Sequence, residues 1–142
     1  MAGYSRTAAN TPANTAVRAY ANVGLESAVA SAHPHRLILM LFEGAILAIA
    51  HARNAMPLKD VPSITAKGKA ISKAIQIVDE GLKASLIDNG TELAANLRAL
   101  YEYMSHRLLL ASLKNDSGVL DEVTRLLNEL KDAWHAIEPS QR

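Results

Sequence analysis

Residues 97–134 constrain the fold most, because they contain two helical patterns separated by a short polar break, Lys114-Asn115-Asp116. Apolar residues of the second pattern follow alternating steps of three and four, as one face of a packed helix requires. They are Leu120, Val123, Leu127, Leu130, Trp134 and Ile137. The first pattern has a stripe of Leu93, Leu97, Leu100, Met104, Leu108 and Ala111. So short a break, with Asp116 as a helix cap, predicts two antiparallel helices packed along these stripes.

The first of these helices has more apolar surface than one core contact needs. Leu108, Leu109 and Leu110 are consecutive, and consecutive helical residues are rotated by about 100° from one another. The three leucines therefore cannot all face one core. With Tyr101 and Tyr103 they could fill a wider core, or some of them could form a groove for a partner outside this chain.

Composition favours one helical domain. The chain has 142 residues, enough for one sizeable core. Its hydrophobic fraction is 49% but its aromatic fraction only 4%, so aliphatic side chains must build the core, which suits helices better than a sheet. The 15 basic and 14 acidic residues form no charged run, which argues against nucleic-acid binding. With no cysteine there is no disulfide or thiolate site, as is common in the cytoplasm.

The rest of the chain completes a bundle. Residues 1–16 are small and polar and predict a flexible tail. Residues 17–33 are weakly amphipathic and predict a short docking segment. Pro34 and Pro62 each suit the first turn of a helix, and Thr91 suits a cap. We expect an all-α fold, an antiparallel up-down four-helix bundle over residues 34–138, with helices at about 34–55, 62–87, 91–114 and 117–137.

No membrane insertion is expected. The longest apolar stretch, residues 37–50, is too short to span a bilayer and contains Glu43, so it predicts a core helix. The N-terminus has no apolar run after a basic segment, and so does not match a secretory signal.

Catalytic and metal-binding patterns are largely missing. The Glu-x-x-His pairs of di-metal bundles do not occur, and Glu102 with His106 is better interpreted as a surface pair. His51 with Arg53 resembles the phosphorylated histidine of helical phosphotransfer domains only weakly, because the following glycine is missing. We therefore expect no enzyme activity, no cofactor and no metal site. The surplus helical apolar surface favours protein binding.

Five blocks in order resemble the FliS family of flagellin-specific export chaperones, over about residues 20–137. The blocks are Ala19-Tyr20 with Val23, Glu26 and Ser27; Pro34 followed by LILMLFEGA at 37–45; Lys73-Ala74-Ile75 with Ile77, Leu82 and Leu86; LYEYM at 100–104 with Arg107-Leu108, Ala111, Leu113 and Asn115-Asp116; and VLDEV at 119–123 through Asp132-Ala133-Trp134. His106 and Ser112 depart from the usual pattern, where a basic residue and Asn are common.

The resemblance implies a cytoplasmic chaperone that binds the disordered C-terminal segment of flagellin. Such a chaperone prevents premature polymerisation of flagellin and aids its delivery to the flagellar type III export apparatus. The expected flagellin-facing residues are Tyr20, Leu41, Phe42, Ile49, Tyr101, Leu109, Leu110 and Leu113. In the family the N-terminal segment can lie over the bundle, so Tyr20, Val23 and Leu25 are the expected plug.

Two alternatives stay open from the sequence. One is a helical bundle that binds another amphipathic helix, such as a co-chaperone or a flagellar regulator. The other is a histidine phosphotransfer domain centred on His51. Contact with the export gate, and a monomer or weak homodimer, are also consistent with the sequence.

Overall fold

The computed structural model describes residues 34–86 and 90–137. The helices are α3 (Pro34–Ala55), α4 (Val61–Gln76), α5 (Glu92–Lys114) and α6 (Ser117–His135), and α4 continues directly into a π-helix, η2 (Ile77–Lys83). These residues contain no strand, and the prediction of an all-α four-helix bundle is confirmed. The predicted flexible tail, 1–16, and docking segment, 17–33, lie outside the described residues.

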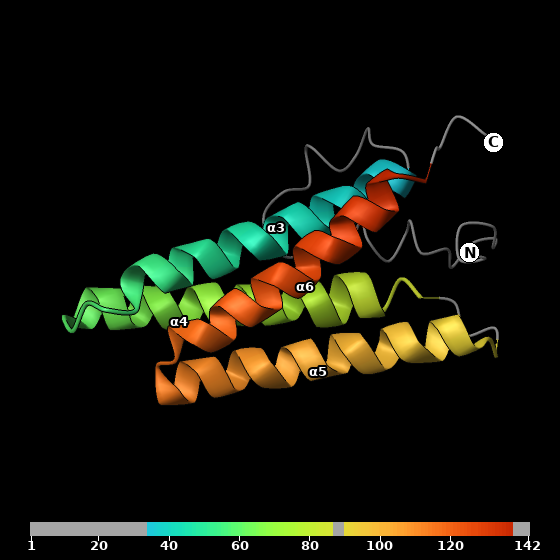
Figure 1. The fold of residues 1–142 in the computed structure, drawn as a ribbon. Helices are drawn as coiled ribbons and strands as arrows, with labels where there is room; N and C mark the ends of the chain where they lie inside the picture. Colours follow the sequence, from blue (N-terminus) through green and yellow to red (C-terminus); the bar gives the residue numbers. More distant parts are fainter. Residues whose placement is uncertain (1–33, 87–89, 138–142) are drawn as a thin grey trace.

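Each helix packs against its neighbours around the bundle (Figure 1). α3 contacts α4 and α6, and α5 contacts the same two helices, so α3 and α5 occupy opposite corners. Residues 56–60 connect α3 to α4, and residues 115–116 connect α5 to α6. Connections this short make consecutive helices antiparallel.

Side-chain caps start three of the helices. Asp116 accepts bonds from the backbone amides of Gly118 at 2.9 Å and Val119 at 3.4 Å, as the sequence predicted. The Thr91 hydroxyl accepts a bond from the amide of Ala94 at 3.1 Å. Asp60 caps α4 through the amide of Ser63 at 3.2 Å. Each cap satisfies an amide that would otherwise have no helical partner.

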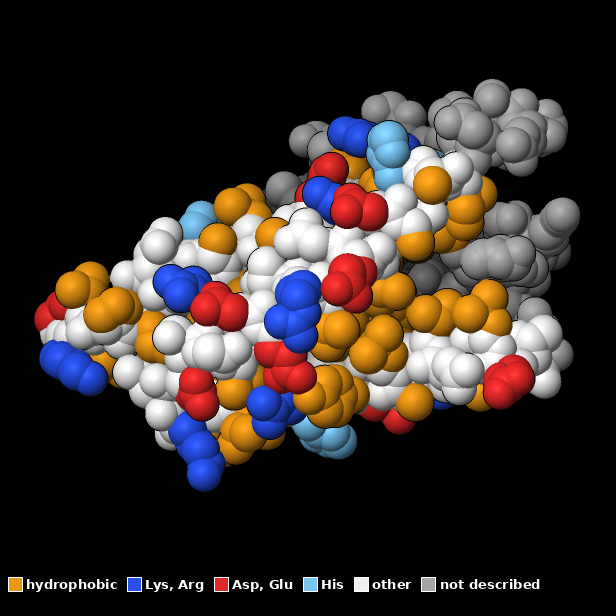
Figure 2. All heavy atoms as spheres, viewed as in Figure 1, with side chains coloured by type: hydrophobic (Ala, Val, Ile, Leu, Met, Phe, Trp, Pro, Cys, Tyr) orange, Lys and Arg blue, Asp and Glu red, His pale blue; other side chains and the backbone are white. Residues whose placement is uncertain are grey.

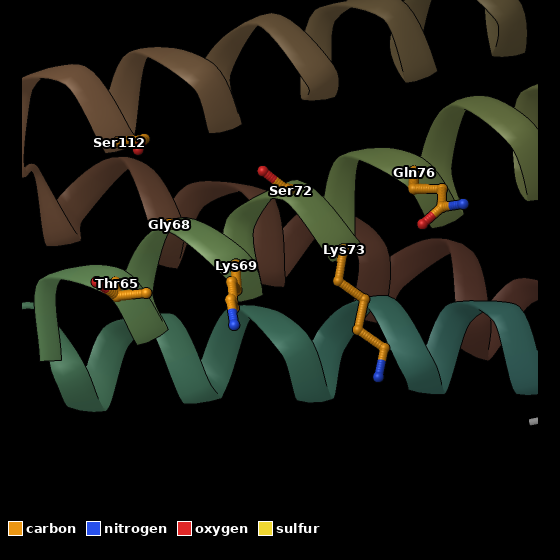
Figure 3. Close-up of a pocket in the computed structure, with 7 residues that line it drawn as sticks. All are labelled: Thr65, Gly68, Lys69, Ser72, Lys73, Gln76 and Ser112. Atoms are coloured by element: carbon orange, nitrogen blue, oxygen red, sulfur yellow. The ribbon is translucent and has the colours of Figure 1, made fainter. Parts of the chain in front are cut away.

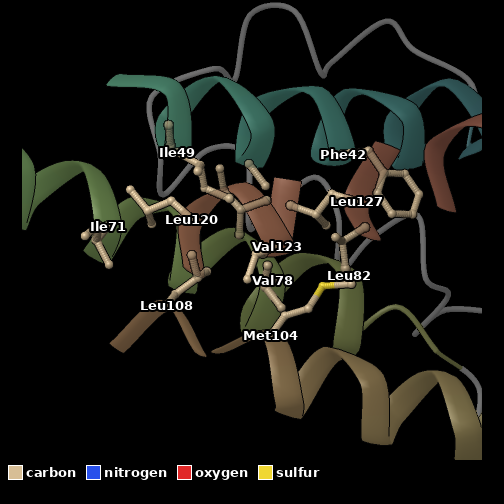
Figure 4. Close-up of a cluster of buried hydrophobic side chains, with 14 of the residues drawn as sticks. Phe42, Ile49, Ile71, Val78, Leu82, Met104, Leu108, Leu120, Val123 and Leu127 are labelled. Atoms are coloured by element: carbon tan, nitrogen blue, oxygen red, sulfur yellow. The ribbon is translucent and has the colours of Figure 1, made fainter. Parts of the chain in front are cut away.

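The core consists of aliphatic side chains from every helix, and many of them converge in Figure 4. Fully buried members include Leu41, Ile49, Ile71, Met104, Leu108, Leu120, Val123 and Leu127. By length and hydropathy α3 is also a candidate membrane span. Half of that apolar window is nevertheless buried within the bundle, which is the behaviour of a core helix.

The π-helix η2 changes which residues of the second long helix face inward. The spacing of apolar residues along this segment predicts an inward stripe of Ile64, Ile71, Ile75, Val78, Leu82 and Leu86. The structure instead buries adjacent pairs, Ile77 with Val78 and Gly81 with Leu82. An i→i+5 turn is wider than an α turn, so it brings one more residue to the core side. A Cβ on Gly81 would lie 2.8 Å from Leu41 Cδ2, so the glycine permits close contact with α3.

Polar side chains fasten the end of the bundle where α5 turns into α6. Asn115 adopts the left-handed conformation, with φ of 52°, and ends α5. Its side-chain amide donates to the carbonyl of Met56 at 3.1 Å. Lys67 Nζ donates to the Ser112 carbonyl at 3.2 Å and to Asn115 Oδ1 at 3.1 Å. These bonds tie the two turns of the bundle together.

Candidate functional site

Four of the residues predicted to face flagellin lie in the core. Leu41, Phe42, Ile49 and Tyr101 are 0%, 3%, 1% and 5% exposed. The sequence interpretation of Leu41 and Ile49 as surface residues is therefore corrected, because the nearly all-apolar α3 is packed against α4, η2 and α6. Tyr20, and with it the predicted plug residues Val23 and Leu25, lie outside the described residues.

The remaining three predicted residues lie on the outer side of α5. Leu108 is fully buried, Leu109 is 50% exposed, Leu110 is partly buried and Leu113 is 76% exposed. The consecutive leucines thus point in different directions, as helix geometry predicts. Leu109 and Leu113 are four residues apart and form one apolar edge. This edge is accessible to a partner.

A shallow groove of about 540 Å³ lies beside this edge, between α4 and α5. Its lining residues are Thr65, Gly68, Lys69, Ser72, Lys73, Gln76 and Ser112. Figure 3 shows Lys69 and Lys73 extending from the same side of α4, away from Ser112 on α5. The groove therefore has small residues along its floor and a basic edge on α4. Sequence reasoning missed it, although the fourfold spacing of Gly68, Ser72 and Gln76 was a signal for a groove between helices.

A second, smaller pocket of about 170 Å³ lies at the other end of the bundle and is almost entirely apolar. Its lining residues are Ile38, Phe42, Ser85, Leu86, Leu93, Leu97, Tyr101, Leu130, Ala133, Trp134 and Ile137. In Figure 2 apolar side chains gather in this region, between the start of α5 and the end of α6. Phe42 and Tyr101 thus belong to the core and also form walls of this pocket.

One wall of the apolar pocket is fixed by a reciprocal contact between His35 and Trp134. His35 Nε2 lies 2.8 Å from the Trp134 carbonyl, and Trp134 Nε1 donates to the His35 carbonyl at 2.9 Å. The two rings stack with centroids 5.1 Å apart. This contact joins the first turn of α3 to the last turn of α6, and it holds the indole at the pocket.

A polar cluster joins α5 to α6 on the outside of the bundle. Glu122 accepts bonds from the Tyr103 hydroxyl at 2.5 Å and from Arg107 Nε at 2.8 Å. These bonds hold the pKa of Glu122 below its ordinary value, the Tyr103 hydroxyl contributing most. Glu122 in turn raises the pKa of Tyr103. The cluster joins α5 to α6, which is a structural role.

The histidine and carboxylate groups of the described residues do not form a metal site. Within residues 34–86 and 90–137, no group of three His, Cys, Asp or Glu side chains is placed to hold a metal. His51 is exposed on α3, and Arg53 pairs with Asp121 of α6 at 2.5 Å. That pair also lowers the pKa of Asp121 through its hydrogen bond. Arg53 is therefore committed to joining α3 and α6.

Comparison with known proteins decides the family. The family model described as flagellar protein FliS matches residues 16–141, which is most of the chain. The chain belongs to the FliS family. Flagellar secretion chaperone FliS of Salmonella typhimurium is 51% identical over 124 residues, which cover 87% of this chain and 90% of that protein. FliSB of Pseudomonas aeruginosa is 45% identical over 86% of this chain and 94% of its own length.

More distant FliS proteins give the same result. Flagellar secretion chaperone FliS of Bacillus subtilis is 36% identical over 82% of this chain and 84% of its own length. The resemblance inferred from five sequence blocks is thus confirmed. FliS relatives are named as secretion chaperones, so the prediction that the chain is not an enzyme is confirmed by its family. The histidine phosphotransfer alternative is not supported.

Proposed function

We propose that this chain is a cytoplasmic export chaperone that binds the disordered C-terminal segment of flagellin. In this role it prevents premature polymerisation and aids delivery to the flagellar type III export apparatus. Membership of a family of flagellar secretion chaperones supports the proposal. The described residues contain no cluster that could hold a metal, which is consistent with a binding role.

The exposed apolar edge of α5 is the structural observation that carries the proposal. Leu109 and Leu113 are 50% and 76% exposed, although leucine is usually buried in a helical bundle. A disordered segment that folds on binding loses about 2–5 kcal/mol in ordering. Exposed apolar side chains next to a groove can offset that cost, since each buried one contributes about 1.5–3 kcal/mol. We therefore keep Leu109, Leu110 and Leu113 as the proposed flagellin-facing residues.

The apolar pocket is the site that we propose for the N-terminal plug. Phe42 and Tyr101 line that pocket, and Ile38 on its wall is only four residues after Pro34, where the described chain begins. We propose that Tyr20, Val23 and Leu25 supply apolar side chains there, and that the client displaces them.

Isothermal titration tests the proposed function. The full chain is titrated with the C-terminal segment of flagellin from the same bacterium, beside a scrambled segment of the same composition. We expect sub-micromolar binding of the native segment, with a gain of helical circular dichroism, and no binding of the scrambled one. Failure of the native segment to bind the folded protein would refute the proposal.

Two variants then separate the proposed surfaces. Leu109→Ser with Leu113→Ser removes the apolar edge of α5, and we expect affinity to fall at least about tenfold. Leu47→Ser is the matched control, because Leu47 is 57% exposed on α3, outside both the groove and the apolar pocket. A chain that lacks residues 1–25 should bind the segment with altered affinity. If the affinity is unchanged, the plug is excluded, but the proposal that α5 contacts flagellin still stands.

A further inference from the structure

The turn between α3 and α4, with the start of α4, exposes apolar side chains at one end of the bundle. Leu58, Val61 and Ile64 are 52%, 74% and 50% exposed. Figure 1 shows this turn as the outermost point of the bundle at that end. Neither the groove between α4 and α5 nor the apolar pocket includes any of these three residues. Their side chains therefore lie on a projecting surface rather than in a cleft.

Local chemistry holds this turn in one shape. Pro57 lies within the turn and Pro62 in the first turn of α4, and each proline ring fixes the φ angle of its own residue. Asp60 accepts bonds from the Ser63 amide at 3.2 Å and from the Ser63 hydroxyl at 2.9 Å. The apolar side chains are thus positioned before a partner arrives, so their binding loses little conformational entropy.

The acidic side chains at this end of the bundle are all engaged within the protein. In residues 53–67 and 112–121 they are Asp60, Asp116 and Asp121. Asp60 and Asp116 cap the N-termini of α4 and α6, where the helix dipole offsets negative charge. Asp121 pairs with an arginine of α3. None of these carboxylates is left to neutralise a lysine.

Three lysines at the same end keep their positive charge. Lys59 is exposed in the turn and Lys114 is exposed in the last turn of α5, and neither makes a hydrogen bond or an ion pair among the described residues. Lys67 is bound by two neutral oxygens at the end of α5, which do not cancel its charge. In Figure 2 apolar and basic side chains lie together at this tip of the molecule.

We propose that this end of the bundle docks on an anionic lipid bilayer. Leu58, Val61 and Ile64 enter the interfacial layer, and the three lysines contact the headgroups. Exposed apolar side chains beside uncompensated cations are the combination that binds proteins peripherally to anionic membranes. A bilayer has no fixed relief, so it can accept a projecting apolar turn that offers a protein partner no cleft. The contact requires no helix to span the membrane and does not depend on flagellin binding.

Vesicle sedimentation tests the docking with the full chain. One set of vesicles contains phosphatidylcholine and phosphatidylglycerol in equal amounts, and the other contains phosphatidylcholine alone. We expect the protein to sediment with the anionic vesicles at low ionic strength and to be released at high ionic strength, because salt screens the lysines. The neutral vesicles should bind at least about tenfold more weakly. No binding to the anionic vesicles at low ionic strength would overturn the proposal.

Substitutions locate the contact on the bundle. Leu58→Ser with Val61→Ser, and separately Lys59→Glu, should each lower the affinity for anionic vesicles at least about fivefold. Leu47→Ser is the apolar control, because Leu47 is 57% exposed on α3. Arg36→Glu is the charge control, because Arg36 is exposed in the first turn of α3, at the opposite end of the bundle. All these side chains are exposed, so the Tm should remain close to that of the wild type. Equal losses in the controls would exclude this end as the docking site.

Tryptophan fluorescence identifies which end enters the lipid. The only tryptophan, Trp134, lies at the far end of α6, so the emission of the wild type should not shift on vesicles. Val61→Trp should add emission that moves to shorter wavelength on anionic vesicles, because the indole enters the interface. A shift in the wild type with no further shift in this variant would refute the proposal. Concentration-dependent dimerisation that Val61→Ser abolishes would also refute it, in favour of a second copy as the occupant.

Discussion

Gly81 and Leu41 provide a strict test of the packing between η2 and α3. The three heavy atoms nearest to a Cβ on Gly81 all belong to Leu41: Cδ2 at 2.8 Å, Cδ1 at 3.1 Å and Cγ at 3.4 Å. Leu41 is 0% exposed, so its methyl groups can move only against other core side chains. Gly81 does not have a positive φ, so alanine is compatible with the backbone there. The effect of Gly81→Ala should therefore be steric.

The magnitude follows from two opposing terms. Alanine gains about 1 kcal/mol over glycine in a helix interior, whereas overpacking a well-filled core costs about 1–3 kcal/mol. Gly81→Ala should therefore destabilise the wild type by roughly 0–2 kcal/mol. Leu41→Ala alone should cost about 2–5 kcal/mol, but it removes all three close atoms. In that background Gly81→Ala should stabilise the protein by about 1 kcal/mol.

Urea unfolding followed by far-ultraviolet circular dichroism measures the four free energies of this double-mutant cycle. We expect a coupling of about 1–3 kcal/mol and a reversed sign for Gly81→Ala, with unchanged m-values. Gly68→Ala serves as the control, because no atom lies near its Cβ, and it should stabilise both backgrounds equally. Additive effects of Gly81→Ala and Leu41→Ala would refute the argument that the glycine exists for close contact with Leu41.

Three further predictions concern the contacts between helices. Asp116→Ala removes the cap of α6 and should lower the free energy of unfolding by about 0.5–2 kcal/mol in urea titrations, while Asp116→Asn should lose much less. His35→Ala should lower the free energy of unfolding by about 1 kcal/mol. It should also shift the fluorescence of Trp134, the only tryptophan, to longer wavelength, and an unchanged spectrum would contradict the stacking. Folding lowers the pKa of Glu122, so its ionised carboxylate stabilises the protein at pH values above the pKa that this group has in the unfolded chain. This stabilisation is lost as the pH falls through the pKa of Glu122 in the folded protein. Glu122→Gln should therefore lower stability at pH 7 but not at pH 2, and equal losses at both would exclude the ionised contact.

Helix positions were predictable because local chemistry specifies them. Asp116 and Thr91 act as caps at the predicted ends, and the stripe of α6 is buried at Leu120, Val123 and Leu127. The sequence predicted the second helix over 62–87. In the structure α4 is followed by the π-helix η2, which ends at Lys83. Periodicity assumes a constant turn, so it cannot predict a π segment that brings adjacent residues inward.

The exposure of individual apolar residues was less predictable. α3 is apolar almost all round, and such a pattern fits a helix surrounded by its own bundle as well as one that binds a partner. In the structure Leu41 and Ile49 belong to the core alone. Phe42 and Tyr101 belong to the core and also line the apolar pocket. The apolar pocket is lined by the ends of several helices, and sequence spacing along one helix has no information about it.

Two adjacent residues of α5 have different roles, because one is buried and contributes to stability while the other is exposed and available for binding. Leu108 is 0% exposed and belongs to the core, whereas Leu109 is 50% exposed and beside the groove. Leu108→Ala should cost about 2–5 kcal/mol, because it opens a cavity among buried neighbours. Substitution of a surface residue such as Leu109 usually changes stability by no more than about 0.5 kcal/mol. A binding defect at Leu109 can therefore be attributed to the partner contact, whereas one at Tyr101 or Phe42 would combine lost binding with a disturbed core.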